Sequence, residues 1–340
     1  MKTLFSVWKV TLMVVLTALV GALHAAILIP FKLLVIIPGV TEIRPANAIP
    51  IACSLMFGPA AAWGAAIGNT IGDMAFGFGP GTFFGMVGNF LYGFAPYALW
   101  RAVFGSTVPD AKKASHWVML VFVTLVASSV CAWTISWGID AVIKGVPFGI
   151  LATIILVNNF LIAVILAPPL LFALLPRVKA WGLLYTTVLP EETARRPRFA
   201  WLGAILFTIG SLGGLVAGES IAWGFHKDPV SFSRFFTQLK AIVVPVSKGG
   251  DATPTTKEGG ALRASPGAGE AIPGVKYGVK PVPKSAVKAG TKPAVVARVP
   301  VKNPVDGGNP VAPRRSVGTA GIGWGLVPFM VLILLGMLLL

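Results

Sequence analysis

Charged side chains are scarce in this chain: Asp, Glu, Lys and Arg make up 12% of its 340 residues, whereas hydrophobic residues make up 55%. Soluble domains carry about 25% charged residues. A single water-exposed domain cannot bury that much apolar surface, but lipid can cover it. The composition therefore argues against a water-soluble enzyme and predicts an integral membrane protein.

Residues that build metal centres and catalytic sites are equally few. The two cysteines, Cys53 and Cys131, lie in separate apolar runs, and the histidines His24, His116 and His226 are far apart in sequence. The HExxH, GxSxG and GxxxxGK[ST] motifs are all missing. We therefore expect no metal site, no cofactor and no enzymatic activity. The energy for any transport would have to come from another polypeptide or from an ion gradient.

Long apolar runs are what the sequence has in abundance. A transmembrane helix needs about 20 consecutive apolar residues. We place seven such runs at 8–37, 47–69, 80–104, 116–140, 147–175, 199–225 and 320–340. They predict an all-α fold, a polytopic membrane helix bundle.

Between the sixth and seventh runs the composition changes to Pro, Gly, Lys, Ala and Val. From Lys227 to Arg315 there are 15 Lys and Arg against 5 Asp and Glu, which gives a net charge of +10. Frequent prolines interrupt any helix there and predict an extended linker. Anionic lipid and nucleic acid both attract such a linker, but aromatic residues for base stacking are almost absent, so we expect no nucleic-acid partner.

These composition changes divide the chain into three parts. We expect a membrane domain at 1–226, a basic disordered linker at 227–318 and a C-terminal transmembrane helix at 319–340.

Small residues recur every four positions in two of the runs. They are Ala18, Ala22 and Ala26 in the first run, and Ala60, Gly64 and Gly68 in the second. Small residues allow helices to approach closely inside lipid. Each stripe is either an intramolecular packing face or a docking surface for a separate membrane subunit, and spacing alone does not decide between the two.

Polar side chains inside the apolar runs are the candidate site residues, because each costs free energy in lipid unless it faces a cavity or a partner. They are Asn47, Asn69, Asp73, Asn89, Tyr92, Asn158, Asn159 and Glu219. Neighbouring helix positions point about 100° apart, so we expect at most one of Asn158 and Asn159 to line a cavity. Trp133 and Trp137, one turn apart, form either a stacking wall or an interfacial belt.

One stretch of the sequence resembles a known family. Residues Glu42–Pro50 (EIRPANAIP) and Leu55–Asn69 (LMFGPAAAWGAAIGN) are similar to substrate-binding S components of energy-coupling factor (ECF) transporters, nearest to the queuosine-precursor branch. Gly85–Tyr92, Asn158–Phe160 and the proline pair Pro168-Pro169 extend the resemblance. It covers roughly residues 8–225.

The resemblance implies a six-helix core in the plasma membrane, followed here by a seventh, C-terminal helix. It implies capture of a vitamin-like micronutrient from outside the cell, and docking on a transmembrane coupling subunit that carries two cytoplasmic ATPases. In this family an alanine-spaced face of the first helix meets the coupling subunit, which implies docking through Ala18, Ala22 and Ala26. The position of the family's pocket implies substrate binding by Arg44, Asn47, Trp133, Asn158 and Asn159.

Membrane orientation and function are not decided by the sequence. With seven alternating runs, the cytoplasmic N-terminus that the resemblance implies puts more Lys and Arg outside than inside, against the positive-inside tendency. A self-contained secondary transporter or channel, and a membrane scaffold whose basic linker recruits a partner, remain alternative functions. The identity of the micronutrient also stays open.

Overall fold

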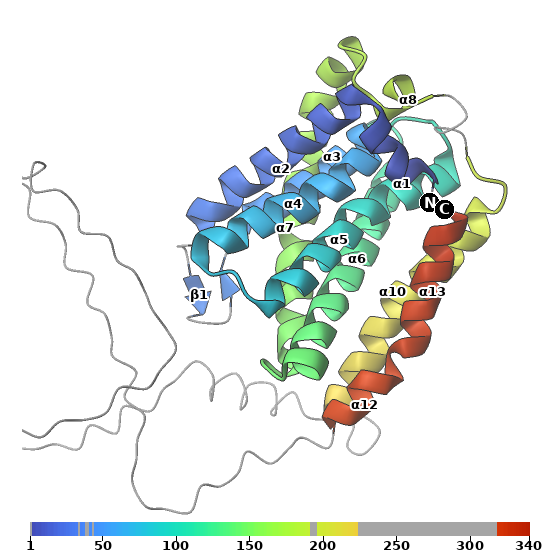
Figure 1. Cartoon of the computed structure of the whole chain (residues 1–340). Coiled ribbons are helices and arrows are strands. Elements are labelled where there is room, and N and C mark those ends of the chain that lie inside the picture. The colour runs from blue at the N-terminus through green and yellow to red at the C-terminus, as the bar shows by residue number, and fades with distance from the viewer. Residues whose placement is uncertain (1, 33–34, 38–40, 43, 191–195, 224–317) are drawn as a thin grey trace, which may run out of the picture. The chain divides into compact units, whose positions relative to one another are not determined.

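The computed structural model describes residues 2–32, 35–37, 41–42, 44–190, 196–223 and 318–340. Most of these residues are helical, and Figure 1 shows the helices packed side by side in a bundle. This arrangement confirms the expected all-α polytopic membrane bundle. The linker expected at 227–318 lies, except for its last residue, outside the described residues.

The chain order of the described elements is as follows. It runs α1 (Lys2–Ser6), η1 (Val7–Lys9), α2 (Thr11–Phe31), β1 (Val35–Ile37), β2 (Thr41–Glu42), η2 (Pro45–Asn47), α3 (Ala48–Phe57), α4 (Pro59–Phe76), α5 (Pro80–Phe104), α6 (Ala114–Trp137), η3 (Gly138–Ile143), α7 (Phe148–Ala180), α8 (Tyr185–Val188), α10 (Ala200–Trp223), α12 (Gly318–Gly325) and α13 (Val327–Leu339). The two strands pair as a short antiparallel hairpin, and η3 is a π-helix that continues α6.

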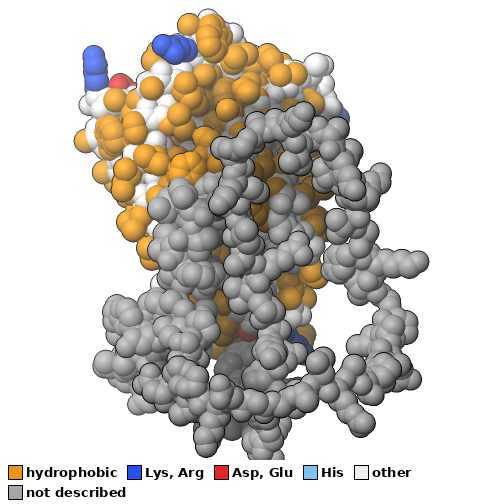
Figure 2. Space-filling model, turned by 90° about the vertical axis from the view of Figure 1, so that its left-hand side faces the viewer, with side chains coloured by type: hydrophobic (Ala, Val, Ile, Leu, Met, Phe, Trp, Pro, Cys, Tyr) orange, Lys and Arg blue, Asp and Glu red, His pale blue; other side chains and the backbone are white. Residues whose placement is uncertain are grey.

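Five helical segments among the described residues are long and apolar enough to cross a membrane. They are Thr11–Phe31, Ala114–Ile143, Phe148–Val188, Ala200–Trp223 and Ile322–Leu339. Figure 2 shows a face on which hydrophobic side chains predominate and Lys and Arg side chains lie at the upper rim. The protein is a multi-pass integral membrane protein, as its composition predicts.

The apolar run expected as one helix at 47–69 is two helices, α3 and α4, and the chain reverses direction between them. Gly58 ends α3 with φ +58°, a conformation that side chains with a Cβ rarely adopt. A Cβ on Gly58 would also lie 2.8 Å from the Tyr185 ring. Pro59 then starts α4 at a position where its fixed φ suits a helix. The expectation of a single helix at 47–69 is therefore wrong, and α2 to α7 are six helices.

Glycines on α4 let this helix pack directly against the backbone of α2. A Cβ on Gly64 would lie 2.6 Å from the Cβ of Val20, and a Cβ on Gly68 would lie 2.7 Å from the main-chain oxygen of Gly21. No larger side chain fits at these positions without separating the two helices. The small-residue stripe of the second run is thus an intramolecular packing face.

The alanine stripe of α2 faces away from α4. Ala18, Ala22 and Ala26 are all exposed. Two neighbours on the same side, Val15 and Leu19, are also exposed, at 55% and 45%. One side of α2 is therefore packed inside the bundle, while the side that carries the alanines is open.

One end of the bundle, called here the cavity end, gathers the ends of helices that are distant in sequence. Lys32, just after α2, forms an ion pair with Asp73 near the end of α4, with 2.7 Å between Nζ and Oδ1. The Asp140 carboxylate in η3 accepts a hydrogen bond from the Phe148 main-chain N–H at the start of α7, at 2.8 Å. The Trp137 indole N–H donates to the main-chain oxygen of Gly323 in α12, at 3.3 Å.

The other end, called here the opposite end, is closed by aromatic and main-chain contacts. The Trp63 indole donates to the main-chain oxygen of Leu4 at 2.9 Å, which ties the N-terminal helix to α4. Arg101, near the end of α5, is buried and donates to the main-chain oxygen of Leu340. Hence α2, α4, α6 and α10 run toward the cavity end, and α3, α5, α7 and α13 run away from it.

Lysine and arginine are unequally divided between the two ends. The cavity end has Lys32, Arg44 and Lys144, whereas the opposite end has Lys2, Lys9, Arg101, Lys112, Lys113, Arg177, Lys179, Arg196 and Arg198. Among the described residues, three basic residues at the cavity end thus stand against nine at the opposite end.

The expected C-terminal helix is present as α12 and α13, in the same compact unit as the other described helices. A Cβ on Gly336 of α13 would lie 2.6 Å from the main-chain nitrogen of Phe207 in α10, so these two helices also pack backbone to backbone. In turn α10 packs against α5, α6 and α7. The pair α10 and α13 therefore lies on the bundle away from the open side of α2 (Figure 1).

Candidate functional site

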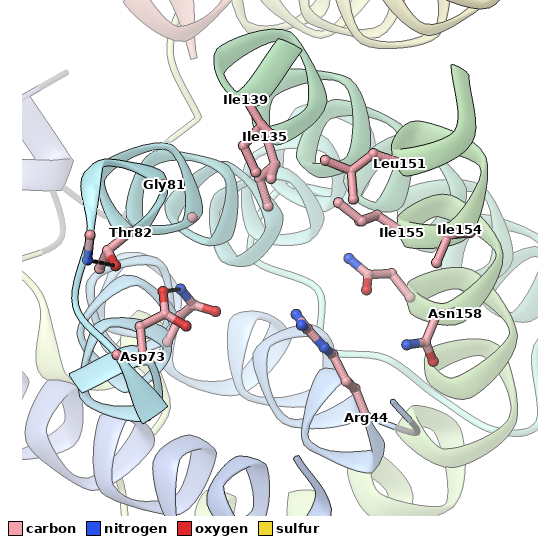
Figure 3. A pocket seen from close by; sticks show the side chains of 15 residues that line it. Arg44, Asp73, Gly81, Thr82, Ile135, Ile139, Leu151, Ile154, Ile155 and Asn158 are labelled. Atoms are coloured by element: carbon pink, nitrogen blue, oxygen red, sulfur yellow. Dashed lines mark hydrogen bonds between the residues drawn. The ribbon is translucent and has the colours of Figure 1, made fainter. Parts of the chain in front are cut away.

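A cavity of ≈ 310 Å³ lies at the cavity end, between α4, α5, α6, η3, α7 and the residue that precedes η2. Figure 3 shows the labelled residues surrounding it from these separate elements. The polar side chains that line it are Arg44, Asn69, Asp73, Thr82, Asn158 and Asn159. The cavity is therefore assembled from residues more than 100 positions apart in sequence.

The wall formed by α4 presents hydrogen-bond acceptors. Asn69 and Asp73 are one helical turn apart and therefore share a face. The Asn69 amide donates to Asp73 Oδ2 at 3.1 Å, while Asp73 Oδ1 binds Lys32. A Cβ on Gly85 of α5 would lie 2.9 Å from the Asn69 amide nitrogen, so a glycine is needed for α5 to pass this wall.

The wall formed by α7 is joined to η2 by a buried hydrogen-bond network. The Asn47 amide donates to Asn159 Oδ1 at 2.7 Å, and the Asn159 amide donates to Cys131 Sγ at 3.5 Å. The Tyr92 hydroxyl lies 3.0 Å from the main-chain oxygen of Asn47 and 3.4 Å from that of Asn159. Such a network holds η2 in place deep inside the bundle and satisfies polar groups that lipid cannot.

Arg44 enters the cavity from the short stretch between β2 and η2. Pro45 begins η2 directly after it, and the main-chain oxygen of Arg44 accepts a hydrogen bond from the Asn47 N–H at 3.0 Å. Figure 3 shows the guanidinium pointing toward the middle of the opening. A cationic, planar donor group is thus placed opposite the acceptors of α4.

The remaining wall is aliphatic. It consists of Ile135 from α6, Ile139 from η3, and Leu151, Ile154 and Ile155 from α7. No aromatic side chain is among the described residues that line the cavity. Polar groups on two sides and flat aliphatic surface between them suit a planar heterocycle, whose edges form hydrogen bonds and whose faces contact apolar side chains.

Metal chemistry has little support in the part of the chain that the structure describes. Within it, no group of three His, Cys, Asp or Glu side chains is close enough together to hold a metal ion. Asp73, the one acidic side chain that lines this cavity, is engaged with Lys32 and Asn69.

The structure brings together four of the five substrate-binding residues expected from the sequence. Arg44, Asn158 and Asn159 line the cavity, and Asn47 binds Asn159 directly. The expectation that at most one of the two adjacent asparagines reaches a cavity is wrong, since both line it.

Trp133 lies elsewhere. It lines a second, entirely apolar cavity of ≈ 370 Å³ between α5, α6 and α13, where its ring packs against Gly214 of α10. Asn69 and Asp73 are among the polar candidates of the sequence, but not among the five residues to which the resemblance assigns substrate binding; both line the cavity. Their four-residue spacing, directly before a glycine-rich turn, is the signal that indicates a shared face at the end of a helix.

The part of the chain that contains this cavity matches a known protein family. A protein-family model described as QueT transporter matches residues 14–176. Comparisons with curated proteins and with solved structures give no significant match. The matched residues run from α2 into α7 and include every residue that lines the cavity, whereas α10, α12 and α13 lie beyond them.

Proposed function

Because a family model described as QueT transporter matches residues 14–176, we propose that the chain is the substrate-capture subunit of an ECF importer. The match supports a substrate-binding component of a transporter in the plasma membrane. In the proposed function it binds a vitamin-like micronutrient outside the cell. It then docks on a transmembrane coupling subunit that carries two cytoplasmic ATPases.

The observation that carries this proposal is the open alanine stripe of α2. The small-residue stripe of α4 packs against α2. Ala18, Ala22 and Ala26 remain exposed on the other side of α2. In lipid, a small-residue stripe gives a neighbouring helix a surface that it can approach closely. This supports docking of a separate membrane helix along α2, with the three alanines as contact residues.

The distribution of basic residues supports an orientation with the cavity end outside. Nine Lys and Arg among the described residues lie at the opposite end and three at the cavity end. Cytoplasmic loops carry the excess of basic residues. The reversal at Gly58 moves each later loop to the other side of the membrane, which is why the sequence alone gave the contrary balance. The connection at 224–317 is longer than the roughly 60 residues over which this rule applies.

The cavity supports a small planar substrate. Its ≈ 310 Å³ is at the lower end of the range of about 300–1,000 Å³ for ligand pockets. A volume of this kind favours a single bicyclic base over a much larger vitamin such as a cobalamin. Amide, carboxylate and guanidinium groups at its edge and isoleucines at its faces suit a queuosine precursor, a 7-deazaguanine base, which is the substrate that we propose.

The docking assignment is tested by co-purification of the chain with its coupling subunit and ATPases. We expect Ala22→Leu to weaken co-purification while it leaves substrate binding intact, since Ala22 is exposed and does not line the cavity. Ile209→Phe is a matched control, because it also adds three carbon atoms to an exposed position, on α10. Normal co-purification of Ala22→Leu, Ala18→Leu and Ala26→Leu would remove α2 as the docking helix.

A further inference from the structure

The side-chain amide of Asn159 is held in one orientation by its neighbours. Its Oδ1 accepts from the Asn47 amide at 2.7 Å, and its Nδ2 donates to Cys131 Sγ at 3.5 Å. Rotation of this amide alone would bring the N–H groups of Asn47 and Asn159 face to face and leave the oxygen against sulfur. An amide nitrogen carries two N–H donors. The second N–H of Asn159 is therefore available to the cavity that this residue lines.

Asn47 does not line the cavity, but its hydrogen bond fixes the orientation of the Asn159 side-chain amide. Both side chains are buried, with exposures of 4% and 5%. Tyr92 fixes the backbones of both residues through its hydroxyl, at 3.0 Å and 3.4 Å. A bonded pair in so confined a space has few alternative arrangements, so Asn47 acts as a positioning residue for Asn159.

The facing wall has the opposite polarity. The Asn69 amide nitrogen already donates to Asp73 Oδ2, and Lys32 donates to Asp73 Oδ1. A carboxylate has about four lone-pair sites, so Asp73 can accept further hydrogen bonds from a ligand. The cavity thus has acceptors on α4 and a donor on α7, and a ligand must match this order.

We propose that Asn159 determines the specificity of the cavity by donating a hydrogen bond to a ring carbonyl of the substrate, while Asp73 accepts from an N–H of the same base. This assignment rests on the proposed function and names the edge of the deazapurine that the site recognises. A guanine-type lactam carries a carbonyl oxygen beside N–H donors. A base with an amino group in place of that carbonyl presents a donor to the Asn159 donor.

The test compares two bases of nearly identical shape, 7-deazaguanine and 2,6-diamino-7-deazapurine, which differ in the 6-oxo or 6-amino group and the matching proton on N1. Calorimetric titration of the purified full chain in detergent gives the affinity for each. Because a donor that faces a donor leaves a buried N–H unpaired, we expect 7-deazaguanine to bind about 5- to 150-fold more tightly.

Two variants separate this proposal from a general structural role. Asn159→Asp replaces the donor by an acceptor of the same size, and we expect the preference for 7-deazaguanine to fall about tenfold or more. Asn47→Ala frees the Asn159 amide to rotate, and we expect the preference to fall to within about threefold. A merely structural role would weaken both bases equally and leave their ratio unchanged. Asn89→Ala is the control, because Asn89 is a buried asparagine that bonds within its own helix.

The outcomes distinguish a wrong substrate class from a wrong assignment of the recognised edge. If the wild-type chain binds neither base, the deazapurine substrate is wrong, and the edge assignment is wrong with it. If the wild-type chain binds both bases equally, or if Asn159→Asp keeps the wild-type ratio, the edge assignment alone is overturned. Asn159→Asp decides this even where Asn47→Ala does not fold, since it conserves the shape of the side chain.

Discussion

Substituting Gly68 with alanine perturbs the contact on which the arrangement of α2 depends. The added Cβ would lie 2.7 Å from the main-chain oxygen of Gly21 and 2.8 Å from the Cβ of His24. Neither atom is at the end of a flexible side chain, so the two helices must move apart. Such overpacking costs about 1–3 kcal/mol. Alanine also gains about 1 kcal/mol over glycine as a helix former, which offsets part of that cost.

A second glycine removes the helix-propensity contribution from the comparison. Gly323 is also helical, but a Cβ there would meet only the Cβ of Ala141, at 4.0 Å, which is an ordinary contact. Gly323→Ala carries the same gain in helix propensity without the clash. The difference in stability between the two variants therefore reports the clash itself, which we expect to be about 1–3 kcal/mol.

Reversible unfolding of both variants and the wild type in mixed detergent micelles measures this difference. Each unfolding free energy is compared at one detergent composition, and bundle formation is followed by the fluorescence of the buried tryptophans. If Gly68→Ala is as stable as Gly323→Ala, then α2 and α4 do not pack backbone to backbone. The inference that the other side of α2 is the open one would then lose its basis.

Three further substitutions test other contacts. Tyr92→Phe removes the donor to the Asn47 main-chain oxygen and should lower the unfolding free energy by about 1–3 kcal/mol. An unchanged unfolding free energy in the same detergent titration would contradict the hydrogen-bond network. Gly58→Ala should cost more than Gly105→Ala. Both glycines have positive φ, which costs an alanine about 1–3 kcal/mol, but only Gly58 also faces the Tyr185 ring; equal losses in thermal unfolding would refute that contact. Lys32→Met removes the ion pair from the largely buried Asp73 and should cost about 1–3 kcal/mol, whereas Lys144→Met, at an exposed lysine, should cost far less in the same assay.

Much of the fold could be predicted from the sequence, because apolar runs of sufficient length have few alternatives to membrane helices. The boundary at Gly58-Pro59 could not be predicted in this way. A glycine after one helix and a proline at the start of the next are a known boundary signal. Within an uninterrupted apolar run, however, the same pair is equally compatible with a bend. The close approach of Tyr185, more than 120 positions away, favours the reversal, and no local pattern records it.

The site could be predicted only in part, for a related reason. Arg44 and Asn159 stand out as polar residues in apolar surroundings, and both line the cavity. The isoleucines that form its faces look like any other lipid-facing residues until the helices are placed. Trp133 is a residue type expected in a stacking wall, but its ring packs against Gly214 of α10. Gly214 lies beyond residues 14–176, which the family model matches, and no periodicity in the sequence pairs it with Trp133.

The pair α10 and α13 extends the bundle on a side away from the cavity and from the alanine stripe of α2. It packs on α5, α6 and α7, none of its described residues lines the cavity, and the three alanines of α2 remain exposed. The tight contact between Gly336 and the α10 backbone accounts for this arrangement, because it lets α13 attach to α10 and make few contacts elsewhere.

Uptake of radiolabelled 7-deazaguanine into vesicles tests the central claim most directly. The full chain is reconstituted alone, and then with the coupling subunit and both ATPases, with and without ATP inside the ATPase-facing compartment. Uptake only with all partners and ATP is the predicted result. Equal uptake by the chain alone, with or without an ion gradient, would contradict the account and identify a self-contained transporter.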